Sequence, residues 1–174
     1  MFKELNTLNL FLEDPTRSFS VREVARILKI SPATASKKLK GFKAQNFLKH
    51  KNELNHDLYK ANLESHKFKD LKTYYSIRKL KESSLIKELD KFYVKPTIIL
   101  FGSISKGLDT KSSDIDLVVI SENTKEFPKK IEFEKLFEKN LQIFAVSNLK
   151  DLKNNHLINN ALNGIVLQGH IIWN

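Results

Sequence analysis

Apolar residues at helical spacing predict three short helices at the start of the chain. The first stripe stops at Glu13-Asp14-Pro15 and consists of Phe2, Leu5, Leu8, Phe11 and Leu12. A capping box of Ser20 and Glu23 predicts a second helix that ends near 29–30. Ser31 and Pro32 predict the cap and first turn of a third helix. This helix runs to about residue 45, and its apolar stripe is Ala35, Leu39 and Phe42.

The pattern then changes to strand spacing and back. Residues 47–51 and 57–63 alternate in polarity around the polar turn 52–55, which predicts a β-hairpin. Helical spacing returns from 66 to 93, with a serine restart at Ser83-Ser84. The two helices expected here have a positive face, which is compatible with an extended DNA footprint and equally with plain solvation. Its members are Lys67, Lys69, Lys72, Arg78, Lys79 and Lys81.

Two short β-branched runs dominate the second half of the chain. Residues 97–101 are too short and too apolar for a surface helix, so we expect a buried strand that Gly102 ends. Residues 103–106 predict a turn or short helix, and 114–121 a second strand. Because alternate strand residues share a face, the side opposite the acidic residues is expected to carry Ile115, Leu117 and Val119.

The remaining segment predicts a helix, a strand, a longer helix and two closing strands. The expected ranges are 132–139, 141–146, 149–163, 165–167 and 171–173. Gly164 is the expected C-cap of the longer helix. The inward residues of that helix are expected to be Leu152, Leu157, Ile158 and Leu162.

Composition and charge narrow the class of protein. Cysteine is absent, which excludes disulfides and thiolate metal sites and fits a cytoplasmic protein. The apolar runs fall far short of the ~20 residues needed to span a bilayer, so we expect no membrane partner. The net charge of +10 lies in the first 95 residues, because 96–174 contain nine basic and nine acidic residues. This asymmetry favours nucleic acid as a partner of the first half, although lysines that only solvate helix faces give the same count.

The order of helix, helix-turn-helix and hairpin is typical of winged-helix domains. The stretch SVREVARILKISPATASKKLKGFKAQNFLKHK resembles the winged-helix domains of microbial transcription regulators. The resemblance implies that the third helix enters the major groove of double-stranded DNA, with contacts from Thr34, Ser36, Lys37, Lys38 and Lys40. Lysines there supply mostly salt-dependent phosphate affinity. Protein docking or dimerisation is the alternative role of such a module, and a homodimer is compatible with it.

The acidic residues Asp114 and Asp116 are the strongest chemical signal. On a strand they project from one face with Cα atoms roughly 6–7 Å apart. Two such carboxylates repel each other unless a divalent cation lies between them, and oxygen ligands suit Mg²⁺ or Mn²⁺, which also take substrate phosphates. Gly102 permits the close approach of a bulky anion, and Ser103 adds a hydroxyl. A solvated turn or a structural cation is the alternative.

Gly102-Ser103, ten residues and Asp114-Ile115-Asp116, set between two apolar strands, resemble the signature of a known family. It is that of the minimal, antitoxin-like nucleotidyltransferases of the DNA polymerase β superfamily. Lys106 and Ser113 fall where such loops often have a basic residue and a serine, and the closing NALNGIVLQGHIIW is similar to the end of these domains. The resemblance covers about residues 95–174.

This resemblance implies a reaction and a set of roles. Asp114 and Asp116 would hold two Mg²⁺ ions and act in catalysis, and the nucleoside triphosphate would be bound by Gly102, Ser103, Lys106 and Ser113. A nucleoside monophosphate, with AMP favoured, would pass to a hydroxyl of a protein or nucleic acid as pyrophosphate leaves. A helical toxin-like protein is the partner that the family implies.

Gln142 departs from the family pattern. Members that catalyse usually have a third carboxylate on the next strand, and the facing position here is Gln142, which cannot act as a base. Glu132 or Glu134 would substitute if the strand boundary were shifted. The alternative function is a DNA-binding regulator whose nucleotidyltransferase domain only binds nucleotide.

The expected architecture is α+β and has three parts. A winged-helix domain occupies residues 1–64, and a basic helical connector follows over 65–95. A nucleotidyltransferase domain, with a small mixed sheet flanked by helices, occupies 96–174.

Overall fold

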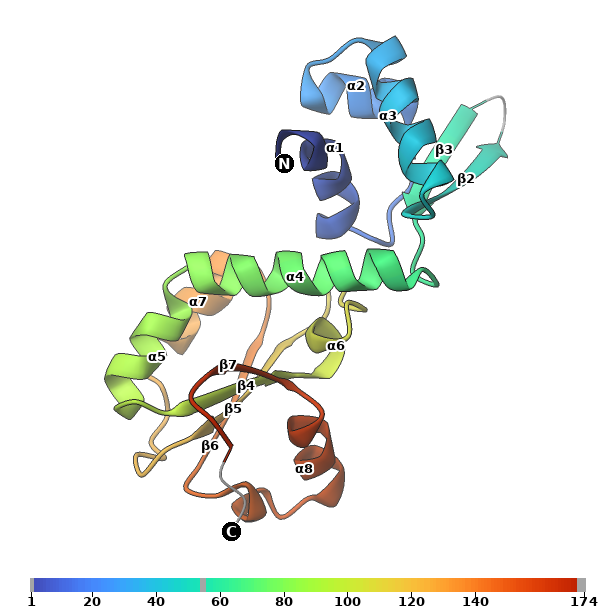
Figure 1. Cartoon of the computed structure of the whole chain (residues 1–174). Helices are drawn as coiled ribbons and strands as arrows, with labels where there is room; N and C mark the ends of the chain where they lie inside the picture. Colours follow the sequence, from blue (N-terminus) through green and yellow to red (C-terminus); the bar gives the residue numbers. More distant parts are fainter. Residues whose placement is uncertain (1, 54–55, 172–174) are drawn as a thin grey trace. The chain divides into compact units, whose positions relative to one another are not determined.

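The computed structural model describes residues 2–53 and 56–171 and has two compact units (Figure 1). One unit is Met1–Lys72 and the other is Thr73–Asn174, so the division falls within a helix, α4. The chain is α+β, as expected. None of the helices in the described ranges has the length and apolarity to cross a membrane.

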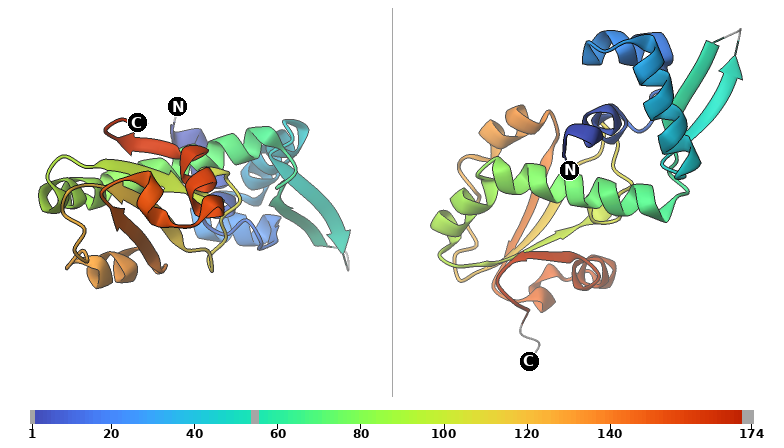
Figure 2. Two further views of the ribbon diagram at one scale, coloured as in Figure 1. Left: turned by 90° about the horizontal axis from the view of Figure 1, so that it is seen from below. Right: turned by 45° about the horizontal axis from the view of Figure 1, so that its top comes forward.

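Within the described residues, the first unit contains three whole helices, the beginning of α4 and a three-stranded antiparallel sheet. Its elements are α1 (Phe2–Glu13), β1 (Phe19–Ser20), α2 (Val21–Leu28), α3 (Pro32–Ala44), β2 (Leu48–Glu53) and β3 (His56–Ala61). The three predicted helices and the hairpin are confirmed, and their order is consistent with a winged helix. The β2–β3 hairpin extends beside α3 (Figure 2).

Local capping explains where these helices begin and end. The Ser20 hydroxyl accepts a hydrogen bond from the Glu23 N–H (3.2 Å), and the Ser31 hydroxyl accepts one from the Thr34 N–H (3.1 Å). Pro32 occupies the first turn of α3, where its missing N–H costs nothing. Lys29 adopts a left-handed conformation (φ 53°) that ends α2.

Two details of this unit differ from the expectation. β1 was not predicted, because two residues are too short to show alternation, yet it pairs with β3 and sets the strand order β1-β3-β2. The predicted turn at 52–55 is wrong for Asn52 and Glu53, which remain paired with Asp57 and His56. Residues 54–55 lie outside the described residues.

The two helices predicted between 66 and 93 are confirmed as α4 (His66–Glu82) and α5 (Leu85–Tyr93). At the serine restart, the Ser83 hydroxyl donates to the Leu80 carbonyl (2.7 Å), and it accepts from the Leu85 N–H (3.3 Å). The prediction of a positive face is wrong for one residue. Lys72 is buried, so its ammonium does not belong to an exposed basic stripe.

The second unit is built on a mixed four-stranded sheet of order β6-β5-β4-β7. The strands are β4 (Thr97–Phe101), β5 (Ile115–Ile120), β6 (Leu141–Val146) and β7 (Ile165–Gln168). β4 is antiparallel to β5 and to β7, whereas β5 and β6 are parallel. The helix α7 (Lys130–Phe137) supplies the crossover that a parallel pair requires. The short helix α6 (Gly102–Ser105) follows β4 directly.

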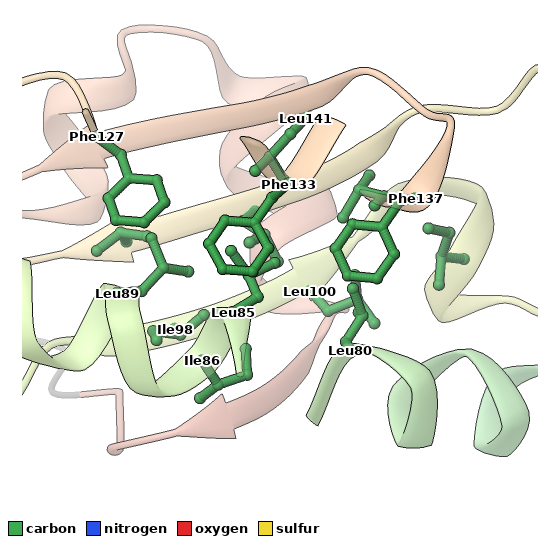
Figure 3. Close-up of a cluster of buried hydrophobic side chains, with 14 of the residues drawn as sticks. Leu80, Leu85, Ile86, Leu89, Ile98, Leu100, Phe127, Phe133, Phe137 and Leu141 are labelled. Atoms are coloured by element: carbon green, nitrogen blue, oxygen red, sulfur yellow. The ribbon is translucent and has the colours of Figure 1, made fainter. Parts of the chain in front are cut away.

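Helices cover both faces of this sheet (Figures 1 and 2). On one face, α5, α7 and the end of α4 pack on Ile98, Leu100 and Leu117. Figure 3 shows Phe127, Phe133 and Phe137 of this cluster beside Leu80, Leu85 and Leu89. On the other face, η1 (Leu149–Leu152) and α8 (Asn155–Leu162) pack on Ile99, Phe101 and Val118. Adjacent residues of one strand therefore point into different cores, as a period of two requires.

The predicted helix 149–163 is wrong as a single helix. Lys153 is left-handed (φ 52°) and Asn154 caps a new helix by accepting from the His156 N–H (3.0 Å), so η1 and α8 are separate. Leu162 was expected to face inward, but it is 41% exposed.

The predicted C-cap and second closing strand also need correction. Asn163 ends α8, and Gly164 lies where a Cβ would be 2.6 Å from the Leu100 carbonyl oxygen. Gly164 is therefore explained by close packing on β4 rather than by a left-handed cap. Of the predicted second strand, Ile171 is not in a strand and 172–173 lie outside the described residues.

Candidate functional site

Gly102, the first residue of the Gly-Ser motif, is in contact with Asp116, the last residue of the Asp-x-Asp motif. Phe101 pairs with Asp116 across β4 and β5, so the turn after Phe101 starts beside this carboxylate. Gly102 has φ +74°, and a Cβ placed on it would lie 2.1 Å from Asp116 Oδ2. Both the backbone conformation and the space therefore require glycine. The Gly-Ser turn and the acidic strand form one site.

Asp114 lies one residue before β5, so the predicted strand start at Asp114 is early by one position. Gln142 Nε2 donates a hydrogen bond to Asp114 Oδ2 (2.5 Å), and Gln142 is also the register partner of Asp116 in the parallel β5–β6 pair. The prediction that Gln142 is the facing position is confirmed. By the alternation along the strands, Asp116 and Gln142 share a sheet face with Val118.

The electrostatics of the pair favour a bound cation. Both carboxylates are half-buried. Burial raises the pKa of Asp116, and the negative charge of Asp114 raises it further. Ionised together, the two groups are poorly solvated and repel each other, so a bound cation would lower the energy of the charged pair.

The donor set fits an oxygen-preferring divalent ion such as Mg²⁺ or Mn²⁺, with two carboxylates and the nearby amide of Gln142. Among the residues that the structure describes, no three or more His, Cys, Asp or Glu side chains gather as a metal cluster. The hypothesis that Glu132 or Glu134 supplies the third carboxylate is therefore wrong. Both lie on α7, and Glu134 Oε1 instead accepts from the Leu141 N–H (3.0 Å).

The other predicted nucleotide-binding residues flank this centre. Ser103 lies in α6 and is half-buried, whereas Lys106 is exposed at the C-cap of α6. The Ser113 hydroxyl accepts from the Thr110 N–H (2.9 Å), so it shapes the loop that leads into Asp114. Ser103 and Lys106 therefore belong to the short helix that begins at Gly102 and to its C-cap. Ser113 makes its contact within its own turn.

Sequence reasoning missed Lys139 and Asp109. Lys139 Nζ donates to the carbonyls of Thr110 and Ser113 and lies 3.9 Å from Asp109 Oδ2. Asp109 is buried. A loop aspartate and a lysine thirty positions later give no local signal of this contact, since it depends on how β5 and β6 pair.

The predicted DNA-contact residues lie on α3. Thr34, Lys37 and Lys40 are exposed, and Ser36 and Lys38 are half-buried. The Thr34 hydroxyl is within hydrogen-bond distance of the Ser31 hydroxyl (2.8 Å) at the helix start.

Lys40 also affects the hairpin beside α3. The pKa of Asp57 is lowered chiefly by its hydrogen bond with His50 (2.7 Å), then by Asn52, and to a smaller extent by the charge of Lys40. The positive charge of Lys40 is therefore felt at the β2–β3 hairpin.

Comparison with known protein families finds a match in the second half of the chain. Residues 82–167 match the family model described as nucleotidyltransferase domain. Among curated proteins, none matches the chain.

A search of solved structures finds similarity over parts of the chain. A structure described as the toxin–antitoxin with AMP-PNP is 25% identical, with 51% of this chain and 73% of that chain covered and a TM-score of 0.41. A variant of Lactococcus lactis ZitR is 21% identical, with coverage of 51% and 60% and a TM-score of 0.36. Pseudomonas aeruginosa HmgR is 15% identical, with coverage of 84% and 53% and a TM-score of 0.32.

The family match contains the whole acidic site. Gly102, Asp114, Asp116 and Gln142 all lie within the matched residues. Residues 82–167 therefore form a nucleotidyltransferase-like domain.

Proposed function

We propose that this protein is a Mg²⁺- or Mn²⁺-dependent nucleotidyltransferase. It moves a nucleoside monophosphate, AMP in the simplest case, from a nucleoside triphosphate to a hydroxyl of a protein or nucleic acid. The contact between Gly102 and the Asp116 carboxylate is the observation that carries this proposal. It brings a turn without a side chain, where a triphosphate can approach the backbone, against a carboxylate pair that favours a cation.

The residues divide into anion-facing and cation-facing groups. The Gly102 backbone and the Ser103 hydroxyl bind the outer phosphates, and the exposed ammonium of Lys106 offsets part of their charge. Asp114 and Asp116 would hold the divalent ion, and the Gln142 amide directs Asp114. A bound divalent ion would supply charge neutralisation along the triphosphate during in-line attack.

The reaction forms a bond between the acceptor oxygen and the α-phosphorus and breaks the bond to pyrophosphate. The acceptor hydroxyl loses its proton in the same reaction. Gln142 cannot take that proton, so an aspartate of the pair or solvent takes it.

Labelled ATP tests the proposal. The protein is incubated with Mg²⁺, α-labelled ATP and two acceptor classes, namely a helical toxin-like protein and nucleic acid. We expect label on one acceptor, abolished when Asp114→Ala and Asp116→Ala are combined and retained in Glu122→Ala, which removes an exposed carboxylate outside the site. Equal labelling by the wild type and the double variant would refute the assignment.

A DNA-binding regulator with a nucleotide-sensing domain is the second candidate. Two observations favour it: exposed lysines along α3, and Gln142 at the place of a third carboxylate. It predicts duplex binding that weakens steeply with salt. Replacing Lys37 and Lys38 with alanine should reduce the salt slope by about 2, since each lysine removed from a phosphate lowers it by roughly one. Undetectable or salt-insensitive duplex binding would exclude it.

Gln142→Glu separates the two candidates. Glutamate at this position adds a third carboxylate next to Asp114 and should raise affinity for Mn²⁺. If the wild type binds ATP without transfer and Gln142→Glu transfers AMP, the wild-type domain is a nucleotide sensor. If the wild type itself transfers AMP, the protein is an enzyme, and DNA binding by α3 is an additional activity.

A further inference from the structure

Lys139 is a half-buried cation that lies against the loop leading to the acidic site. Its ammonium donates to the carbonyl oxygens of Thr110 and Ser113, the second at 3.1 Å. The Ser113 N–H donates to the Thr110 carbonyl (3.2 Å), so residues 110–113 form a turn whose two ends are both bonded to Lys139. The turn leads directly into Asp114.

The low exposure of both side chains makes this contact important for stability. The side chain of Lys139 is 18% exposed and that of Asp109 is 3% exposed, with 3.9 Å between Nζ and Oδ2. An ammonium and a carboxylate removed from water are costly unless each finds charge and hydrogen-bond partners. The turn carbonyls and Asp109 supply them for Lys139, so this lysine is held in one place rather than solvated.

The segment from Lys139 to Gln142 makes three successive contacts with the start of β5. After Lys139, the Asn140 carbonyl accepts from the Ile115 N–H (2.8 Å), and Gln142 then donates to Asp114 (2.5 Å). The end of the α7–β6 connection thus lies along the entry to the acidic strand.

The two aspartates depend on this segment to different extents. Asp116 lies inside β5 and is paired on both sides, with Phe101 and with Gln142. Asp114 precedes β5, so the turn before it and the Gln142 amide set the direction of its carboxylate. A change in the 110–113 turn should therefore move Asp114 and leave Asp116 in place.

We propose that Lys139 is a positioning residue for the divalent-ion site, and that it acts through Asp114. The Asp109 carboxylate fixes the ammonium, the ammonium fixes the 110–113 turn, and the turn fixes Asp114. This role of Lys139 rests on the proposed nucleotidyl transfer. It is tested by measuring ion binding, which does not require transfer.

The test uses variants that separate positioning from folding. Lys139→Met alone removes one charge of a buried ion pair and is expected to destabilise the fold. The main variant therefore combines Lys139→Met with Asp109→Asn, which removes both charges and keeps similar volumes. Asp109→Asn alone retains the ammonium on the turn, and Lys139→Arg keeps two donors for the two carbonyls.

Mn²⁺ affinity by electron paramagnetic resonance is the readout, and thermal unfolding is measured in parallel. The combined variant should melt within a few degrees of the wild type and bind Mn²⁺ about 10-fold or more weakly, the size seen when partners of metal ligands are removed. Lys139→Arg should retain most of the affinity. In an Asp114→Ala background, the combined change should cause no further loss, because its effect passes through Asp114.

Three outcomes would overturn the role of Lys139. They are wild-type Mn²⁺ affinity in the combined variant, a full additional loss in the Asp114→Ala background, or no Mn²⁺ binding by the wild type. A wild type that binds Mn²⁺ but transfers no AMP, with the variants behaving as expected, would refute the transferase assignment alone.

Discussion

The two candidate functional regions of this chain are built in opposite ways. The predicted DNA-contact residues lie within seven consecutive positions of α3, and a single helix with a Ser31 cap presents them. The acidic site combines a turn after β4, the residue before β5 and a residue of β6. These parts are far apart in the chain, from Gly102 to Gln142. One region is local and mostly exposed, whereas the other is non-local and half-buried.

This difference predicts different tolerance to change. A residue on the exposed side of a helix can be replaced without moving a neighbour. Gly102 lies against the Asp116 carboxylate, so a larger residue at this position would displace that carboxylate. The chain offers a matched pair for this comparison, because Gly41 lies inside α3 with nothing within 4 Å of a Cβ placed on it.

Gly102→Ala should have the largest effect. The added methyl would overlap Asp116 Oδ2, and the φ of +74° strains any residue with a Cβ. We expect a loss of roughly 1–3 kcal/mol in unfolding free energy, measured by urea denaturation, and ATP binding too weak to detect by calorimetry. Unchanged ATP binding would show that the turn does not take part in nucleotide binding.

Gly41→Ala should act in the other direction. Alanine loses less backbone entropy than glycine in a helix interior, so unfolding free energy should rise by about 0.5–1 kcal/mol. Duplex affinity at fixed salt should stay the same. Loss of stability here would mean that α3 packs more tightly at Gly41 than the open space around its Cα indicates.

Asp116→Asn should stabilise the metal-free protein by a smaller amount. Because the pKa of Asp116 is raised by burial and by Asp114, its ionised form is disfavoured in the folded state. At pH 7 with chelator, asparagine removes that penalty, and the gain should be a few tenths of a kcal/mol for a partly exposed, screened group. Melting temperature against pH measures it.

The sign of this effect is fixed by proton linkage. Below the unfolded-state pKa, Asp116 is protonated in both states and the gain should disappear. The gain should appear as the pH rises through the folded-state pKa. A melting-temperature difference independent of pH would assign the effect to packing instead of charge.

Glu88→Gln should have the smallest effect and serves as a reference outside both regions. Hydrogen bonds from Lys129 (2.7 Å) and Lys91 (2.9 Å) lower the pKa of Glu88 to about 2 from 4.5. Its contribution to stability is therefore present above pH 4.5 and lost as the pH falls through about 2. The variant should melt slightly below the wild type at pH 7 and low salt, and the difference should shrink in high salt. A difference that keeps its full size as the pH falls to 2 would contradict this account.

Short-range signals in the sequence predicted most of the individual helices and strands. The bounds of β4 and β6, the caps at Ser20 and Ser31 and the serine restart before α5 follow from short-range sterics and hydrogen bonding. These act within a few residues, so they are visible in sequence. The failures were non-local: β1 is defined by its partner β3, and Gly164 by its approach to Leu100.

For the acidic site, the sequence alone determined the residue types and the spacing. The Gly-Ser turn, Asp114 and Asp116 between two apolar runs, and the amide at position 142 were evident without any structure. Only the tertiary structure decided which atoms meet: Asp116 on Gly102, Gln142 on Asp114, and Lys139 on the turn before it. The physical reason is register, since strand pairing selects the contacts between residues far apart in the chain, and no local preference encodes it.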